Sequence, residues 1–190
     1  MRATSLSILT SEHSLPVAAP ADSRLEIEFR GVAKHFPGRG KSAATLAVQG
    51  LDLAIRRGEV VSIIGPSGCG KSTLLNMGAG LYAPSEGEVR VGGERVSGPV
   101  RKVSFMLQKD LLMPWRSIRR NIELGLEIDG RAAGERRAIA EEMLEKCHLA
   151  GFAEHYPFQL SGGMRQRAAL ARTLAPDPQV LFPDEPFSAL

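Results

Sequence analysis

Residues 65–72 constrain the fold of this chain more than any other part of its sequence. They read Gly-Pro-Ser-Gly-Cys-Gly-Lys-Ser and match the pattern G-x-x-x-x-G-K-[ST] of a phosphate-binding loop. The β-branched run at residues 59–64 predicts a strand in a sheet covered on both faces. Residues 73–77 continue as a predicted helix. A strand before the loop and a helix after it form the context in which such a loop binds a nucleotide.

The residue types in this loop suit a bound phosphate. Its glycines let the backbone curl until successive N–H groups point inward around the anion. Lys71 supplies charge for the β- and γ-phosphates, and the Ser72 hydroxyl is a ligand for Mg²⁺. The dipole of the following helix also favours the anion at its first turn. The predicted nucleotide-binding residues of this segment are Gly65, Pro66, Ser67, Gly68, Cys69, Gly70, Lys71, Ser72 and Thr73.

Composition and charge exclude several classes of protein. The chain has 190 residues, and its 43% hydrophobic content excludes wholesale disorder. A net charge of +3 is too small and too scattered to indicate a nucleic-acid partner. Cys69 and Cys147 lie far apart in the sequence without a metal-like spacing and suggest neither a zinc site nor a disulfide scaffold, which favours a reducing, cytoplasmic setting. The sequence contains no apolar run near the roughly 18 residues of a membrane span.

The rest of the chain divides into three parts. Residues 1–24 show no period of 2 or 3.6, and we interpret them as a flexible N-terminal extension without a targeting signal. From residue 25 apolar and charged residues alternate, which predicts a half-exposed strand, and residues 46–48 and 51–55 predict two more. A helical insert is expected between Lys109 and Gln159. Its stripe of Ile139, Met143, Leu144 and Cys147 indicates a packed core face rather than a cofactor site.

A second motif narrows the choice among phosphate-loop proteins. Residues 160–167 read Leu-Ser-Gly-Gly-Met-Arg-Gln-Arg, and a helix-forming run follows Ser161 and the two glycines. With this order of motifs, residues 25–190 resemble the nucleotide-binding subunit of an ATP-binding cassette (ABC) transporter. The resemblance implies an α/β fold of the P-loop NTPase type, with a mixed sheet and flanking helices. It also implies an N-terminal antiparallel β part and a helical subdomain at about residues 109–165.

The resemblance assigns roles to further residues. In the family, the Leu-Ser-Gly-Gly motif of one subunit caps the ATP bound by its partner, which implies a homodimer or a paired ATPase subunit. Phe36 would stack on adenine, although a plain hydrophobic residue at a strand end is the alternative. Glu185 would polarise the attacking water as the catalytic residue. The Mg²⁺ ligands would be Ser72, Gln108 and Asp184, and the capping residues would be Ser161, Gly162, Gly163 and Met164.

Residues 110–116 carry the only hint of a transported solute. Their Leu-Leu-x-Pro-Trp-Arg pattern looks like the nitrate, sulfonate, taurine and bicarbonate branch of ABC importers. Trp115 would line a groove for a helix of the membrane subunit, or would pack in the core. The resemblance therefore implies transmembrane permease subunits, a periplasmic or lipoprotein solute-binding protein, and a peripheral place on the inner face of the cell membrane.

The sequence departs from the family pattern in two places. Pro183 precedes Asp184 directly, and a proline inside a central strand removes a hydrogen bond of the ladder. The chain also stops at Leu190, so the last core strands and the switch histidine of the family are absent from this sequence. We therefore predict that the isolated 190-residue chain folds poorly and hydrolyses ATP weakly or not at all. The two rival hypotheses are a non-catalytic remnant that binds nucleotide and a soluble, non-transport ABC ATPase.

Overall fold

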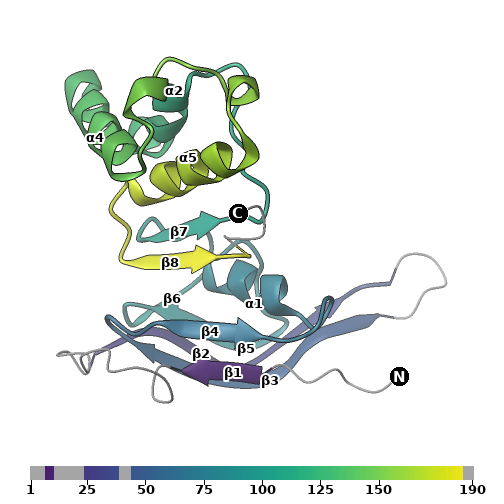
Figure 1. The fold of residues 1–190 in the computed structure, drawn as a ribbon. Helices are drawn as coiled ribbons and strands as arrows, with labels where there is room; N and C mark the ends of the chain where they lie inside the picture. The colour runs from purple at the N-terminus through teal and green to yellow at the C-terminus, as the bar shows by residue number, and fades with distance from the viewer. Residues whose placement is uncertain (1–6, 11–23, 39–43, 186–190) are drawn as a thin grey trace. The chain divides into compact units, whose positions relative to one another are not determined.

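The computed structural model describes residues 7–10, 24–38 and 44–185 (Figure 1). The chain divides into two compact units, residues 1–100 and residues 101–190, and each unit is described by itself. Among the described residues, no helix combines the length and the apolar character needed to cross a membrane.

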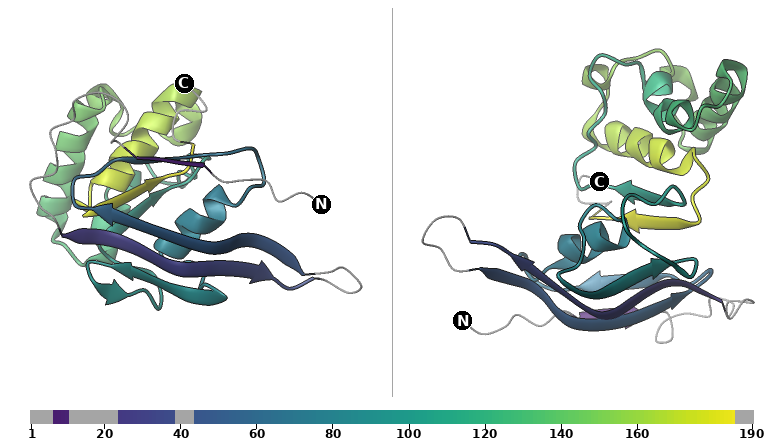
Figure 2. Two further views of the ribbon diagram at one scale, coloured as in Figure 1. Left: turned by 90° about the horizontal axis from the view of Figure 1, so that it is seen from below. Right: turned by 180° about the vertical axis from the view of Figure 1, so that it is seen from behind.

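An antiparallel sheet forms the main layer of the first unit. Its strand order is β3-β2-β5-β6. The strands are β2 (Leu25–Phe36), β3 (Thr45–Arg56), β5 (Glu86–Val91) and β6 (Glu94–Arg95). Ile27 and Phe29 of β2 are buried, as the alternating pattern predicts. The two segments expected near residues 46–55 form one long strand, β3, which runs beside β2 (Figure 2).

The strand before the phosphate loop differs from the prediction. Strand β4 (Val61–Ile64) pairs only with β1 (Ser7–Thr10) among the described strands, in an antiparallel two-stranded sheet. The expectation that β4 is covered on both faces is wrong, because its residues alternate between half-buried and exposed and Ile64 is 52% exposed. Strand β1 also lies in the segment where no element was predicted. Its backbone supplies partners for the N–H and C=O groups of β4. Residues 1–6 and 11–23 lie outside the described residues.

Helix α1 (Lys71–Gly78) packs on the sheet of the first unit. Leu74 and Met77 are fully buried and lie one turn apart, so they form the apolar face that anchors the helix. The helix expected after the phosphate loop is therefore confirmed. Because α1 is anchored in this way, the loop at its N-terminus has a fixed support.

Helices and a short parallel sheet form the second unit. Strand β7 (Val103–Met106) pairs in parallel with β8 (Val180–Pro183). The helical elements are α2 (Ile118–Ile122), α3 (Leu124–Ile128), α4 (Ala133–Lys146), η2 (Ala150–Phe152), η3 (Pro157–Gln159) and α5 (Gly162–Leu174). All of them except α5 lie within the region predicted to be a helical insert, and α5 coincides with the helix-forming run expected after Ser161.

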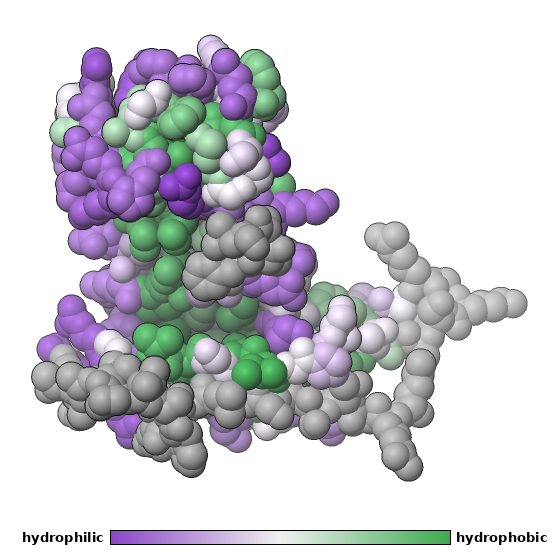
Figure 3. Space-filling model, in the orientation of Figure 1, coloured by the Kyte–Doolittle hydropathy of each residue, from purple (hydrophilic) through white to green (hydrophobic). Residues whose placement is uncertain are grey.

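The core of the second unit confirms the predicted apolar stripe of α4. Leu144 is 1% exposed, and Ile139, Met143 and Cys147 are partly buried against the same cluster. Hydrophilic residues cover the outer parts of the helical region, with a hydrophobic area between them on the face drawn in Figure 3. Because the side chains of the α4 stripe are buried or partly buried against this cluster, the stripe is a packing surface.

Candidate functional site

The phosphate loop joins β4 to α1, and its shape depends on glycine. Gly70 precedes α1 and has a left-handed backbone with φ of 104°. A Cβ atom at this position would lie 2.4 Å from the carbonyl oxygen of Ala47 in β3. Any side chain here would have to displace backbone. Gly70 thus lets the loop pass close to β3 and enter the helix at Lys71.

The N-terminus of α1 is open to an anion. No side chain in the described part of the chain caps this helix, and its first turn contains no acidic residue. The amides of a helix's first turn have no acceptor within the helix, so they can donate to an outside group. With the helix dipole, these amides favour a negatively charged ligand.

The Lys71 ammonium lies directly over the loop. Its Nζ donates to the carbonyl oxygens of Gly65 at 2.7 Å and Pro66 at 3.0 Å. Ser72 follows on the exposed side of the first helical turn. The predicted phosphate ligand and the predicted Mg²⁺ ligand therefore both stand at the start of α1.

Phe36 ends β2 in a small aromatic cluster. Its ring makes an edge contact with Tyr82, with ring centroids 5.8 Å apart, and the Lys34 ammonium lies 5.3 Å from the Phe36 centroid. Phe36 is half-buried, which leaves part of its ring accessible. Sequence reasoning missed Tyr82, because it follows α1 in a turn that matches no motif. The adenine contact of Phe36 stays a prediction.

In the second unit the structure brings Gln108 and Glu185 together. The parallel register pairs Met106 with Pro183, so each of these residues follows the end of its strand by two positions. Gln108 Nε2 donates to Glu185 Oε2 at 2.7 Å. Because two parallel strands end at the same edge, side chains far apart in the sequence meet there.

Pro183 does not interrupt the ladder between β7 and β8. The N–H groups of Val180 and Asp184 donate to the carbonyl oxygens of Lys102 and Met106, at 3.1 and 2.8 Å. Alternate residues of a strand point their N–H groups to the same edge, so position 183 faces away from β7. The missing N–H of proline therefore removes no bond from this pair, and Asp184 keeps its backbone anchor.

Ser161 is the N-cap of α5. Its Oγ accepts a hydrogen bond from the Met164 N–H at 3.3 Å, and Gly162 and Gly163 form the first helical turn. Ser161 and Gly162 are exposed, so the turn presents backbone rather than bulky side chains. The predicted capping residues thus stand together at one helix start. The predicted site residues of the chain fall in both units, with residues 36 and 65–73 in the first and residues 108, 161–164, 184 and 185 in the second.

Comparison with known proteins decides the family. The family model described as "ABC transporter" matches residues 48–188, which is more than half of the sequence. The chain belongs to the ABC transporter family.

Curated members of this family include close relatives of the chain. An uncharacterized ABC transporter ATP-binding protein of Methanocaldococcus jannaschii, MJ0412, is 41% identical over 167 residues, which is 88% of this chain and 62% of the relative. The taurine import ATP-binding protein TauB of Yersinia pestis is 47% identical over 144 residues, covering 76% of this chain and 56% of TauB. The chain therefore spans about three fifths of the length of these relatives.

Solved ABC cassettes share the fold. The ATP-binding cassette MJ0796, in a dimeric post-hydrolysis state with ADP and Pi, superposes with a TM-score of 0.76 at 34% identity. The match covers 86% of this chain and 75% of MJ0796. The α/β fold of an ABC cassette is thereby confirmed for the chain.

A surface pocket lies in the helical part of this ABC cassette. Its volume is about 440 Å³, and its lining includes Trp115, Arg116, Arg119, Arg120, Glu154 and Tyr156. Trp115 is 73% exposed, so the alternative that it packs in the core is wrong. We call this feature the Trp115 pocket.

Ion pairs order the walls of the Trp115 pocket. Arg119 is largely buried and contacts Glu123 at 2.6 Å and Glu154 at 2.8 Å. Arg116 donates to Glu127 at 2.7 Å, and this bond holds the pKa of Glu127 below its ordinary value. Glu127 therefore stays ionised and paired at neutral pH. The pocket combines an exposed indole with guanidinium groups, and tryptophan and arginine are enriched among residues that dominate protein interfaces.

Alkylation of Cys69 should block ATP binding by this ABC cassette. The Cys69 thiol is partly buried within the loop, and its Sγ lies 4.0 Å from Lys71 Nζ. A maleimide adduct would fill the space for phosphate. Bound Mg-ATP should in turn slow the labelling about 100-fold at 100 times Kd, as read by peptide mass spectrometry.

Cys147 provides the internal control for this experiment. Burial raises the pKa of the Cys147 thiol, so its reactive thiolate is scarcer at pH 8 than that of a free cysteine. Its labelling should be slow and independent of ATP, and a Cys147→Ser variant should leave the Cys69 result unchanged. Labelling of Cys69 that leaves ATP affinity intact would show that the thiol lies away from the phosphate.

Proposed function

We propose that this protein is the ATP-binding subunit of an importer for a small anion or a sulfonate, and that it binds and hydrolyses ATP. One observation carries the catalytic part of this proposal: Gln108 bonds to Glu185 where two parallel strands end. A paired amide and carboxylate can hold a water molecule in line for attack on a phosphate. The phosphate loop supplies the separate binding function through Lys71 and the α1 amides.

The predicted Mg²⁺ ligands are chemically suited to an Mg²⁺ ion that is bound together with ATP. Ser72, Gln108 and Asp184 offer hydroxyl, amide and carboxylate oxygens, and Mg²⁺ prefers oxygen ligands with substrate phosphates and water completing its shell. The bound ion would neutralise charge on the phosphates. Lys71 and the loop amides would hold the same phosphates in place during transfer.

Glu185 would carry the proton in hydrolysis. The water oxygen forms a bond to the γ-phosphorus while the bond from that phosphorus to the bridging oxygen breaks, and ADP leaves. Glu185 takes the proton that the attacking water loses, and Gln108 orients the carboxylate through its 2.7 Å bond. Such catalysis depends mainly on positioning and charge compensation. Capping of ATP by Ser161, Gly162, Gly163 and Met164 of a second subunit would complete the site, and the dimeric state of MJ0796 supports that arrangement.

The solute class rests on sequence similarity. TauB, a taurine import protein, is 47% identical to the chain over 144 residues. The stretch at residues 110–116 also looks like the branch of importers for nitrate, sulfonates, taurine and bicarbonate. The proposed partners are accordingly a pair of permease subunits and a solute-binding protein, with this subunit on the inner face of the membrane.

The Trp115 pocket would receive a segment of the permease. A Trp115→Ala substitution should lower the amount of co-purified permease about 30-fold, since a buried interface tryptophan is worth about 2 kcal/mol. Ile128→Ala is the matched control, because Ile128 is 74% exposed in the same unit. An equal loss of co-purified permease with both variants, or no loss of it with Trp115→Ala, would contradict docking at this pocket.

The test of the whole proposal is purification of the tagged protein from its own cells in mild detergent. Mass spectrometry should find integral membrane subunits, and the reconstituted complex should take up radiolabelled taurine or nitrate when given ATP. Recovery with ribosomes or DNA would favour a soluble ABC ATPase instead. A protein that binds ATP but brings down no partner and shows no turnover would be the non-catalytic remnant.

A further inference from the structure

The loop that carries Trp115 has no regular secondary structure. This loop, residues 107–117, connects β7 to α2 and is called the Trp115 loop below. Trp115 stands in a tight turn in which the Arg116 N–H donates to the Met113 carbonyl oxygen at 3.1 Å. One such bond gives little rigidity to a turn whose central side chain is 73% exposed. Further hydrogen bonds to this turn come from α2.

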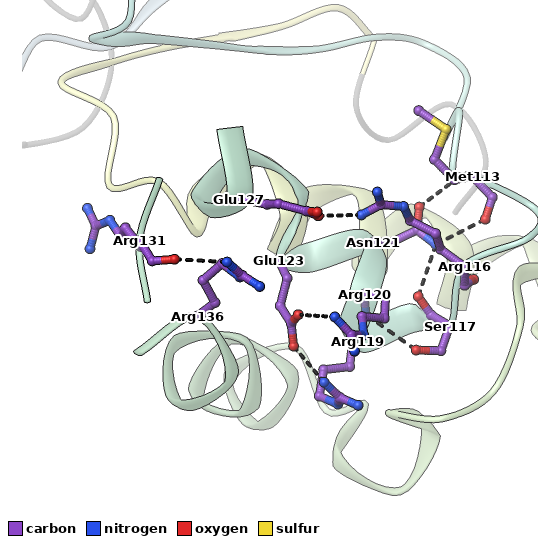
Figure 4. Close-up of polar contacts among 10 residues, drawn as sticks. All are labelled: Met113, Arg116, Ser117, Arg119, Arg120, Asn121, Glu123, Glu127, Arg131 and Arg136. Carbon is purple, nitrogen blue, oxygen red and sulfur yellow. Dashed lines mark hydrogen bonds and ion pairs between the residues drawn. The ribbon is translucent and has the colours of Figure 1, made fainter. Parts of the chain in front are cut away.

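Asn121 of α2 lies beneath this turn and bonds to both of its ends. Its Oδ1 accepts from the Met113 N–H at 2.7 Å. Its Nδ2 lies 3.1 Å from the carbonyl oxygens of Met113, Arg116 and Ser117. Figure 4 shows the carboxamide within this ring of backbone groups.

The side chain of Asn121 is completely buried. Its exposed fraction is 0%, and its neighbours on α2, Ile118 and Ile122, are also fully buried. A buried amide without partners would be costly, and here the turn supplies them. The hydrogen bonds therefore couple the conformation of the turn to the packed core of the helical region.

The other end of the Trp115 loop is bonded separately. Arg172 of α5 donates to the carbonyl oxygens of Asp110 and Leu111 at 2.6 and 2.7 Å. Arg165 contacts the Asp110 carboxylate at 3.0 Å. These bonds hold the loop before the turn, whereas Asn121 bonds to the turn itself.

We propose that Asn121 is a positioning residue that fixes the turn of Trp115 in the orientation needed to bind the membrane subunit. This inference rests on the proposed function, because docking is the event that the fixed indole serves. A single carboxamide both accepts from one end of the turn and donates to both ends. An aspartate of the same shape can only accept, and it would face three carbonyl oxygens with a negative charge.

The first test uses the fluorescence of Trp115, the one tryptophan in the sequence. In Asn121→Asp, the amplitude of nanosecond motion in time-resolved anisotropy should rise about twofold. Thr173→Val is the matched control, because Thr173 is also a buried polar residue, and its hydroxyl donates to the Ala169 carbonyl oxygen within its own helix, α5. This control should leave the anisotropy at the wild-type value. Unchanged anisotropy in Asn121→Asp overturns the inference.

The second test measures recovery of the permease with single and double variants. Asn121→Asp should reduce recovery about tenfold, and the double variant with Trp115→Ala should lose no more than Trp115→Ala alone. Additive losses would mean that Asn121 acts by another route, which overturns the inference. If wild type recovers no membrane subunit, the proposed function fails, and the anisotropy alone decides whether Asn121 positions the turn.

A third measurement covers the case in which Asn121→Asp does not fold, as judged by circular dichroism. Hydrogen exchange of the wild-type protein should show the Met113 amide protected about 100-fold relative to an open chain. Its protection depends on the bond to Asn121 Oδ1. Exchange of the Met113 amide at the open-chain rate would overturn the inference without any substitution.

Discussion

Lys71→Ala is expected to weaken ATP binding about 100-fold, because a charge-assisted hydrogen bond to phosphate contributes up to about 3 kcal/mol. The Lys71 ammonium already lies over the loop, within 2.7 Å of the Gly65 carbonyl oxygen. Alanine keeps the helix but removes the charge. Calorimetric titration of Mg-ATP into both proteins measures the difference.

Lys146→Ala is the charge-matched control for this substitution. Lys146 is exposed on α4, where it pairs with Glu142 at 2.7 Å, and its loss should leave ATP affinity unchanged. Equal affinities of wild type and Lys71→Ala would mean that the phosphates bind elsewhere. Circular dichroism of both variants excludes a loss of fold as the cause of weaker binding.

Glu185→Gln is expected to lower kcat for ATP hydrolysis about a thousandfold while ATP affinity stays close to that of wild type. Glutamine has the shape of glutamate and can still accept the 2.7 Å bond from Gln108. It cannot take a proton from the attacking water. Phosphate release should be measured in the protein as its own cell makes it, in complex with its partners.

Two comparisons make the Glu185 result decisive. Glu145 is exposed on α4 and lies far from Glu185 in the sequence. Glu145→Gln also removes one carboxylate, and it should leave kcat unchanged. Retention of kcat in Glu185→Gln would assign the proton transfer to another group. A matching loss of ATP affinity would instead show that Glu185 serves in binding.

The sequence predicts the parts of the fold that local patterns specify. The alternation at residues 25–29, the phosphate loop with α1 and the cap at Ser161 each depend on a few neighbouring residues. The family resemblance assigns both Gln108 and Glu185 to ATP hydrolysis, and the structure shows why they meet, since the parallel strands β7 and β8 end side by side. At each of these positions, the local geometry of the chain allows few other structures.

Long-range pairing explains what sequence reasoning missed. The apolar run of β4 resembles a strand covered on both faces, yet its partner in the described chain is β1, a strand without a clear period. Tyr82 meets Phe36 only after the sheet has formed. Asn121 has no motif either, because its role depends on a turn several residues away folding back onto α2. Such contacts depend on tertiary structure, which single-residue patterns do not encode.

The central claim is that the loop at residues 65–72 binds a nucleotide, and calorimetric titration of wild-type protein with ATP in the presence and absence of Mg²⁺ tests it most directly. The account predicts saturable binding of one ATP per chain, tighter with Mg²⁺ and competed by ADP. AMP should compete poorly, because Lys71 is proposed to bind the outer phosphates, which AMP lacks. A folded protein that shows no saturable binding of ATP at millimolar concentration would contradict the account.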